Sequence, residues 1–265
     1  MVLTMHCATE GDRVRMALST RPWRRAASRV YHPGPRFRAA GSLAEVVSAW
    51  EVVYRVYGDA GLIDPNPYRI HTVPHAVGPQ AAVILDVLQS MIVSTVTVMR
   101  DTDAGLPLDI IFRDEIDALR AGGRQITEAG LYVDRRDAGM QAADSVLSLV
   151  NFVLTWSFAR GGTDLIIGVH PRHEVFYEDF YGFERLGPER PFPVVNNHRC
   201  VLLRLAREQM DQPAGRRPRG LRFYQLAPPP MSFFEDRTDF HEDSEARDTI
   251  DAYLAWRESR AAESD

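Results

Sequence analysis

The sequence has few cysteines, no long apolar run and no excess of positive charge. Only Cys7 and Cys200 occur among 265 residues, so neither a disulfide framework nor a cysteine-based zinc site can be built from them. This cysteine usage fits a reducing cytoplasm. No apolar stretch reaches the roughly 18 residues that a membrane-spanning helix needs. The formal net charge of −5 argues against nucleic acid as the main partner, because phosphate binding needs a concentrated basic surface.

Several motifs that would indicate other functions are also missing. Arg13 and Arg15 interrupt the apolar core that a secretory signal peptide needs, so we expect a cytoplasmic protein. Neither a Gly-x-Ser-x-Gly elbow, a Walker motif nor a dinucleotide fingerprint is present. His71 and His75 have the i,i+4 spacing of metal ligands, but Pro74 opposes the helix that would align them. We therefore expect no metal and no tightly bound cofactor.

Composition and charge divide the chain into three parts. Residues 1–39 form a basic extension in which we expect mobility, 40–207 a folded domain, and 208–265 a linker with an acidic, charged terminal helix. The two termini carry opposite charge. One interpretation of these charges is that both termini are solvated tails. The alternative is that the basic N-terminal arm contacts an acidic partner.

Within the central part, hydrophobic periodicity predicts an α/β (α+β) fold. Ser42 and Glu45 have the spacing of a helix capping box. Strands and helices then follow in an order that indicates a mixed sheet with helices on its faces. The expected strands are 81–86, 91–99, 125–133, 164–169 and 199–205, and the expected later helices are 113–121, 139–160, 173–181 and 244–262. Gly130, inside a predicted strand, indicates a bulge or a place where a ligand approaches the backbone.

The segment from Val169 to Phe183 reads as a strand, a sharp turn, an aromatic helix and then Gly182-Phe183. It resembles the corresponding segment of GNAT acyltransferases, and its Pro-Arg-His and Phe-Tyr spacings resemble the FeeM-type N-acyl amino acid synthases. Further similarities lie around it, in order, over about residues 42–206. They are Tyr54–Tyr57, Gly105–Leu108 with Phe112, Glu128 with Val133–Asp134, and Pro193–Asn196.

This resemblance implies a GNAT-like mixed, mostly antiparallel sheet flanked by helices, in which strands 4 and 5 are splayed. It also implies an N-acyltransferase that moves a fatty acyl group from a thioester to the amine of an amino acid or similar molecule. The donor substrate would be an acyl-phosphopantetheine thioester, carried by acyl carrier protein or CoA. A catalytically degenerate GNAT-fold protein, which binds an acyl carrier or lipid without turnover, is the alternative function.

Two residues are candidates for catalysis under this resemblance. Glu128 would orient the acceptor ammonium or accept its proton through a water. Its other interpretation is an exposed strand residue, since alternation turns some side chain outward. Tyr177 would protonate the leaving thiolate, and its alternative is an aromatic that only packs.

The donor phosphate would bind where a helix begins after strand 4, and Val133, Arg136, Gly139, Met140 and Gln141 are the candidates there. Gln141 stands where the CoA-binding pattern expects a small residue, and Asp137 adds negative charge. We therefore expect a weakened pyrophosphate cradle, which suits a carrier-protein donor better than free CoA. An ordinary helix N-terminus with basic neighbours is the alternative.

Substrate-binding candidates are Arg55, Arg100, Gly130, His170 and Arg172. Relatives tend to carry arginines in the first helix, in the hairpin strand and after the strand-4 glutamate. Val53, Thr97 and either Gly130 or Leu131 occupy those places here. The polar network around Glu128 is therefore expected to be rebuilt or lost.

Overall fold

In the computed structural model, residues 37–135, 140–213, 215–226 and 243–262 are described. They contain a seven-stranded sheet in the order β1-β2-β3-β4-β5-β7-β6. The strands are β1 (Phe37–Ala39), β2 (Ala81–Leu88), β3 (Met91–Arg100), β4 (Ile126–Asp134), β5 (Asp164–Val169), β6 (Glu184–Phe192) and β7 (His198–Ala206).

The sheet is mixed and mostly antiparallel, as the sequence predicts, and β4 and β5 form its parallel pair. These two strands pair only from Ile126–Ala129 on β4 to Asp164–Ile167 on β5. Beyond that point β4 stays with β3 and β5 stays with β7. The two strands therefore diverge, which confirms the expected splay.

A bulge lies on β4 where the splay begins. Thr97 pairs with Gly130 and Thr95 pairs with Val133, so two β4 residues oppose the single Val96. Leu131 takes up the extra length with a φ of +52°, a left-handed conformation that non-glycine residues seldom adopt. The sequence predicts this bulge from Gly130.

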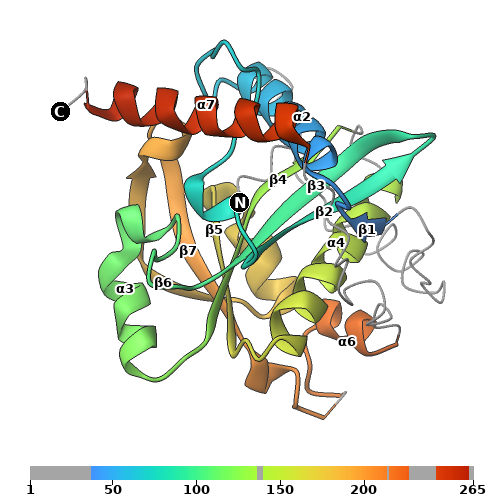
Figure 1. The fold of residues 1–265 in the computed structure, drawn as a ribbon. Helices are drawn as coiled ribbons and strands as arrows, with labels where there is room; N and C mark the ends of the chain where they lie inside the picture. Colours follow the sequence, from blue (N-terminus) through green and yellow to red (C-terminus); the bar gives the residue numbers. More distant parts are fainter. Residues whose placement is uncertain (1–36, 136–139, 214, 227–242, 263–265) are drawn as a thin grey trace, which may run out of the picture.

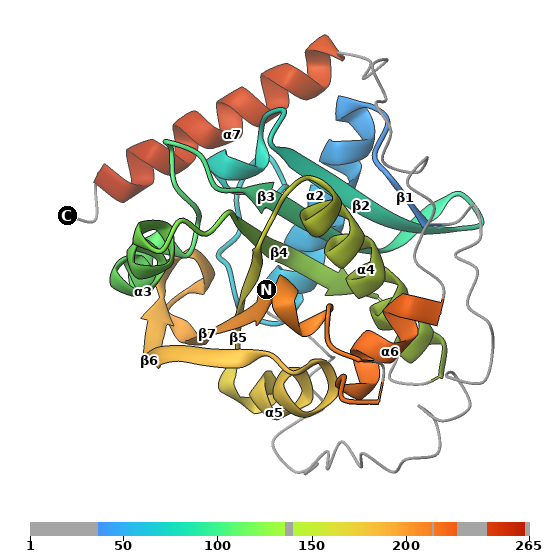
Figure 2. The ribbon, with the colours of Figure 1, turned by 90° about the horizontal axis from the view of Figure 1, so that it is seen from below.

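Helices cover both faces of the sheet (Figures 1 and 2). On one face, α2 (Leu43–Asp59) and α7 (Ser244–Ala262) pack side by side, and α3 (Asp109–Ala121) flanks β6. On the other face lie α4 (Met140–Ala159), α5 (Glu174–Phe176) and α6 (Arg219–Leu226). Each face has its own hydrophobic cluster, because strand residues alternate between the two layers.

Local signals explain most of these elements. The Ser42 hydroxyl accepts the Glu45 N–H at the start of α2, as a capping box requires. A turn at Gln89 and Ser90, both with positive φ, joins β2 to β3 in a hairpin. The aromatic segment differs from expectation: α5 is short and passes into a π-helical turn at Tyr177–Tyr181. Two strands and a helix, β1, β6 and α6, were not predicted.

The N-terminal extension and the C-terminal helix also differ in part from what the sequence predicts for them. The last three residues of the 1–39 segment form β1, and most of its basic run lies outside the described residues. The predicted terminal helix is α7, which buries Ala246, Ile250 and Tyr253 against the α2 layer. The C-terminal part therefore includes a helix that packs on the central sheet.

Candidate functional site

Glu128 lies on β4 and is buried, with 3% of its surface exposed. Its Oε2 accepts a hydrogen bond from the backbone N–H of Leu108 at 3.0 Å. Burial raises the pKa of this carboxyl to about 8, and the Leu108 hydrogen bond opposes that rise. The alternative of an exposed strand glutamate is excluded by its burial. A carboxyl with this pKa can hold or release a proton near neutral pH.

The loop that contacts Glu128 is held by a network of charged groups. The Asp109 Oδ2 accepts the Leu106 N–H at 2.7 Å and is paired with Arg120 at 2.7 Å. Arg120 also pairs with Asp101 at 2.7 Å. Gly105 has a φ of +76°, and a Cβ there would lie 2.4 Å from Asp109 Oδ2. The Leu108 N–H is therefore presented to Glu128 by a fixed loop.

The Glu128 side chain opens onto a small cavity on the α2 face of the sheet, which we call the Glu128 cavity. Its free volume is about 30 Å³, enough for about one water molecule. Gly130 shares this cavity, and a Cβ added to it would meet Met99 Cε at 3.5 Å and Glu128 Oε1 at 3.8 Å. The cavity is lined by Tyr57, His71, Val73, Met99, Pro107, Glu128, Gly130, Leu131, Phe192, Val194 and Val195.

His71 and Tyr57 are the other polar side chains among the residues that line the Glu128 cavity, and sequence reasoning proposed neither of them for the site. The His71 Nδ1 lies 3.3 Å from the Tyr253 hydroxyl of α7. The same hydroxyl accepts the Thr72 N–H at 3.4 Å, and the Arg257 guanidinium donates to the Thr72 carbonyl. Burial, with a smaller contribution from the Arg257 charge, lowers the pKa of His71 to about 3. The imidazole is therefore neutral at physiological pH.

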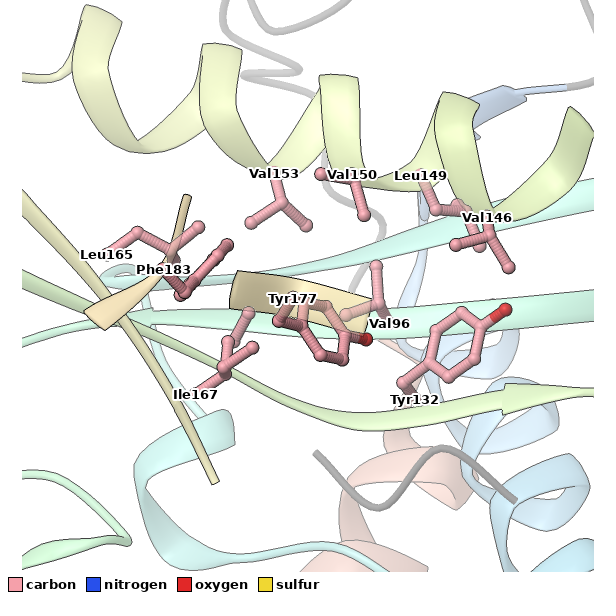
Figure 3. Close-up of a pocket in the computed structure, with 11 residues that line it drawn as sticks. Val96, Tyr132, Val146, Leu149, Val150, Val153, Leu165, Ile167, Tyr177 and Phe183 are labelled. Atoms are coloured by element: carbon pink, nitrogen blue, oxygen red, sulfur yellow. The ribbon is translucent and has the colours of Figure 1, made fainter. Parts of the chain in front are cut away.

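Tyr177 lies on the opposite face of the sheet, in a cavity beneath α4 (Figure 3). We call this the Tyr177 cavity. Val146, Leu149, Val150 and Val153 of α4 point toward it. The phenols of Tyr132 and Tyr177 are the polar groups among its lining residues, and its free volume is about 20 Å³. Burial raises the pKa of Tyr177 above its usual value, so the phenol is neutral and carries its proton at physiological pH.

Glu128 and Tyr177 therefore do not share a cavity. They lie on opposite faces because β4 turns Glu128 toward α2 and the next residue, Ala129, toward α4. The pairing of β4 with β5 ends just beyond Ala129 and Ile167, and we call this place the opening between β4 and β5.

The remaining substrate-binding candidates lie away from both cavities. Arg55 is exposed on α2 and donates to the Glu51 carbonyl at 3.4 Å. Arg100 follows Met99 on β3, so alternation turns it to the face opposite Glu128. His170 accepts the Arg172 N–H at 3.2 Å in the turn after β5, and Arg172 is exposed. None of the four lines the Glu128 cavity or the Tyr177 cavity.

Of the donor-binding candidates, the structure describes Val133 in full. Its side chain is buried on the Glu128 face and its carbonyl accepts the Ser94 hydroxyl at 2.6 Å. Arg136 and Gly139 lie outside the described residues, as do the side chains of Met140 and Gln141 at the start of α4. The predicted phosphate cradle stays a prediction.

The positions where relatives tend to carry arginine are filled by small or apolar residues. Val53 is fully buried in α2. Thr97 is buried on β3, and its hydroxyl has no hydrogen-bond partner among the described residues. The polar groups near Glu128 come instead from the Leu108 amide and from His71. The spacing of Ala246, Ile250 and Tyr253 is a helical apolar stripe, a signal that a helix docks there but not of the residue that Tyr253 contacts.

Among the described residues, no group of histidine, cysteine, aspartate and glutamate side chains could hold a metal ion. A search of those same residues finds no helix with the length and apolar character needed to cross a bilayer.

Comparison with known proteins adds one family and several similar structures. A family model described as N-acyl amino acid synthase FeeM matches residues 48–206, which is more than half of the chain. The structure of FeeM, an N-acyl amino acid synthase from uncultured soil microbes, is similar with a TM-score of 0.54 and 23% identity, over 64% of this chain and 94% of that one. TofI, solved with an inhibitor and MTA, is similar with a TM-score of 0.51 and 14% identity, over 72% of this chain and 96% of the other. No curated protein matches.

Proposed function

The chain belongs to the FeeM family of N-acyl amino acid synthases and is an N-acyltransferase, and on this premise we propose its substrates and the roles of its residues. A fatty acyl group would pass from acyl carrier protein to the amino group of an amino acid. The observation that carries the proposal is a buried, titratable Glu128 on one face of the sheet and an apolar cavity with Tyr177 on the other. The two flank the opening between β4 and β5.

The acceptor amine belongs on the Glu128 side. An ammonium group must lose a proton before its nitrogen can attack, and Glu128 can take that proton directly or through a water. A pKa near 8 leaves a usable fraction of carboxylate at neutral pH, and the base is stronger than an exposed glutamate would be. The attack then forms the C–N bond as the C–S bond of the thioester breaks.

The donor belongs in the opening and the Tyr177 cavity. The strand edges beyond Ala129 and Ile167 are not paired with one another, so they can pair with the amides of a pantetheine arm. The departing thiolate would accept a proton from the neutral Tyr177 phenol. The acyl chain would lie beneath α4, among apolar side chains (Figure 3). The free volume there is too small for a fatty chain, so we expect α4 side chains to move when the donor binds.

Carrier protein is favoured over CoA by the sequence at 136–141. Asp137 and Gln141 weaken the expected pyrophosphate cradle, whereas a carrier protein presents a single phosphate at its surface. The protein would meet such a donor in the cytoplasm.

A second candidate function is supported by a difference between this chain and its relatives. Val53 and Thr97 replace arginines that relatives tend to carry, and a protein that lost them could bind an acyl carrier without turnover. Incubation of the purified protein with long-chain acyl carrier protein or acyl-CoA and each standard amino acid, followed by mass spectrometry, separates the two functions. We expect an N-acyl amino acid and free carrier thiol, with the carrier-protein donor preferred. Binding of the acyl carrier without product would instead support the degenerate protein.

A further inference from the structure

Helix α7 contacts a residue that lines the Glu128 cavity, although the helix lies outside the segment that the family model matches. That match ends at residue 206, and α7 spans Ser244–Ala262. Its Tyr253 is 1% exposed and lies against His71, which lines the cavity. The helix therefore supports the wall of the site from a part of the chain that the family need not share.

The hydrogen bond between the Tyr253 hydroxyl and His71 Nδ1 can run in either direction. A hydroxyl donates one hydrogen bond and accepts two, and the Thr72 N–H uses one of the acceptor sites of Tyr253. When Tyr253 donates to Nδ1, the neutral imidazole carries its own hydrogen on Nε2. This Nε2–H tautomer is the one that can donate to a ligand.

The Nε2 atom of His71 is buried and has no hydrogen-bond partner among the described residues. Tyr253 contacts the Nδ1 edge of His71 and does not line the Glu128 cavity, whereas His71 does. A buried polar atom without a partner is destabilising, because it has lost its hydrogen bonds to water. A ligand oxygen in the cavity would remove this cost.

We propose that His71 donates its Nε2–H to the carboxylate of the acceptor amino acid and that Tyr253 is the positioning residue that keeps it able to do so. This inference rests on the proposed function. Glu128, on β4, would take the amino end of the same molecule, so an acid and a neutral imidazole of the cavity match the two polar ends of an amino acid. The free volume of about 30 Å³ is too small for the whole acceptor, so we expect the cavity walls to move when it binds. The Arg257 guanidinium, fixed on the Thr72 carbonyl, adds positive charge on the His71 side and favours an anion there.

Steady-state kinetics with paired acceptors tests the proposal. We expect His71→Phe, which keeps a ring without the N–H, to raise KM for the amino acid about 10- to 100-fold, with a smaller change in kcat. Against the amine that lacks the carboxylate of that amino acid, the variant and the unaltered protein should be equal. A similar loss with both acceptors, or no loss with either, would overturn the role of His71.

The positioning role of Tyr253 has its own matched pair of variants. Tyr253→Phe removes the hydrogen bond to His71 Nδ1 and should raise KM for the amino acid about 3- to 10-fold. Tyr68→Phe is the control, because the Tyr68 ring packs edge-on against Tyr253 and Trp256 at 6.2 and 6.4 Å between centroids. If both variants raise KM equally, packing of α7 explains the effect and Tyr253 has no positioning role.

Calorimetry measures amino acid binding directly, so it tests the His71 contact independently of acyl transfer. If no acyl product is formed, each standard amino acid is titrated into the unaltered protein and into His71→Phe. Binding that His71→Phe weakens about 10-fold or more supports the His71 contact even without catalysis. Failure of every amino acid to bind the unaltered protein, or equal binding to both proteins, would overturn it.

Discussion

The two cavities on either side of β4 are built in different ways. The Tyr177 cavity is lined by apolar residues and two phenols from α4, the sheet and the aromatic segment (Figure 3). The Glu128 cavity joins a carboxyl on β4, an imidazole at residue 71 and the ring of Phe192. Its outer support comes from α7, since Tyr253 and His71 are 182 residues apart in the sequence. The Tyr177 cavity is therefore an apolar surface formed mostly by elements that are close in the sequence. The Glu128 cavity is a polar site formed by residues that are far apart in the sequence.

This difference matches the two halves of the proposed reaction. A fatty chain needs only an apolar surface, and many different apolar side chains can form it, because the hydrophobic effect is not directional. An amino acid needs a few donors and acceptors at fixed positions. We therefore expect changes on the α4 face to alter chain preference, and changes on the α2 face to alter catalysis and acceptor binding.

The largest effect is expected for Glu128→Gln. The amide keeps the shape and can still accept the Leu108 N–H, but it cannot take a proton from the amine. We expect kcat to fall about 10²- to 10⁴-fold, the usual contribution of a general base, measured as N-acyl product by mass spectrometry. If Glu128→Gln kept more than a tenth of the activity, Glu128 would not be the general base.

Glu51→Gln is the matched control for this change. Glu51 is an exposed glutamate of α2, and it lines neither cavity. Its activity should equal that of the unaltered protein, so an equal loss in both variants would indicate an indirect effect.

The second prediction tests the burial of Glu128 through stability. Burial raises its pKa to about 8 in the folded state, above 4.5 for an ordinary glutamate. Between those pH values the folded state holds more protons than the unfolded state, so this group's stability contribution falls as pH rises. Glu128→Gln lacks this dependence. Urea denaturation should therefore show the variant gaining roughly 4 kcal/mol relative to the unaltered protein from pH 5 to pH 9.

The same pair of proteins provides the control for that measurement. Other titrating groups are shared by both proteins, so their contributions cancel in the difference between the two curves. A difference that stays constant from pH 5 to pH 9 would mean that Glu128 is not buried as a titrating carboxyl.

The order of elements and the position of Glu128 could be predicted from sequence because their signals are local. Ser42, the hairpin turn and Gly130 each act on their immediate neighbours. The edge strand β6 was missed because Gly187, Pro188 and Pro191 lie within it, and these residues are depleted in strands. The partner of His71 was missed because a contact across 182 residues leaves no mark in local periodicity. Glu128 and Tyr177 lie on opposite faces of the sheet. This arrangement depends on how the strands assemble into the sheet, because the assembled sheet determines which layer each side chain enters.

The third prediction addresses the apolar side. Val150 of α4 lines the Tyr177 cavity and is partly exposed, so Val150→Phe can fill the cavity with less strain than a change deeper in the core. We expect kcat/KM for a long-chain donor to fall about 10- to 100-fold, because the filled cavity excludes the chain. Activity with a short-chain donor should change much less.

The control for that variant is Val47→Phe on α2, where a valine is also partly exposed but lies on the other face of the sheet. It should leave the chain-length preference unchanged. If both variants lose activity with all donors alike, the Tyr177 cavity does not hold the acyl chain.

The last prediction concerns Tyr177→Phe, which decides whether Tyr177 acts in chemistry or only packs. A proton donor to the leaving thiolate contributes to kcat, so we expect a loss of about 10- to 100-fold in kcat with little change in either KM. Tyr181→Phe is the matched control, since its hydroxyl is buried in the same segment with no hydrogen-bond partner among the described residues. Its activity should be unchanged. If Tyr177→Phe also keeps full activity, the thiolate must take its proton from another group or from water, and Tyr177 is an aromatic that packs beneath α4.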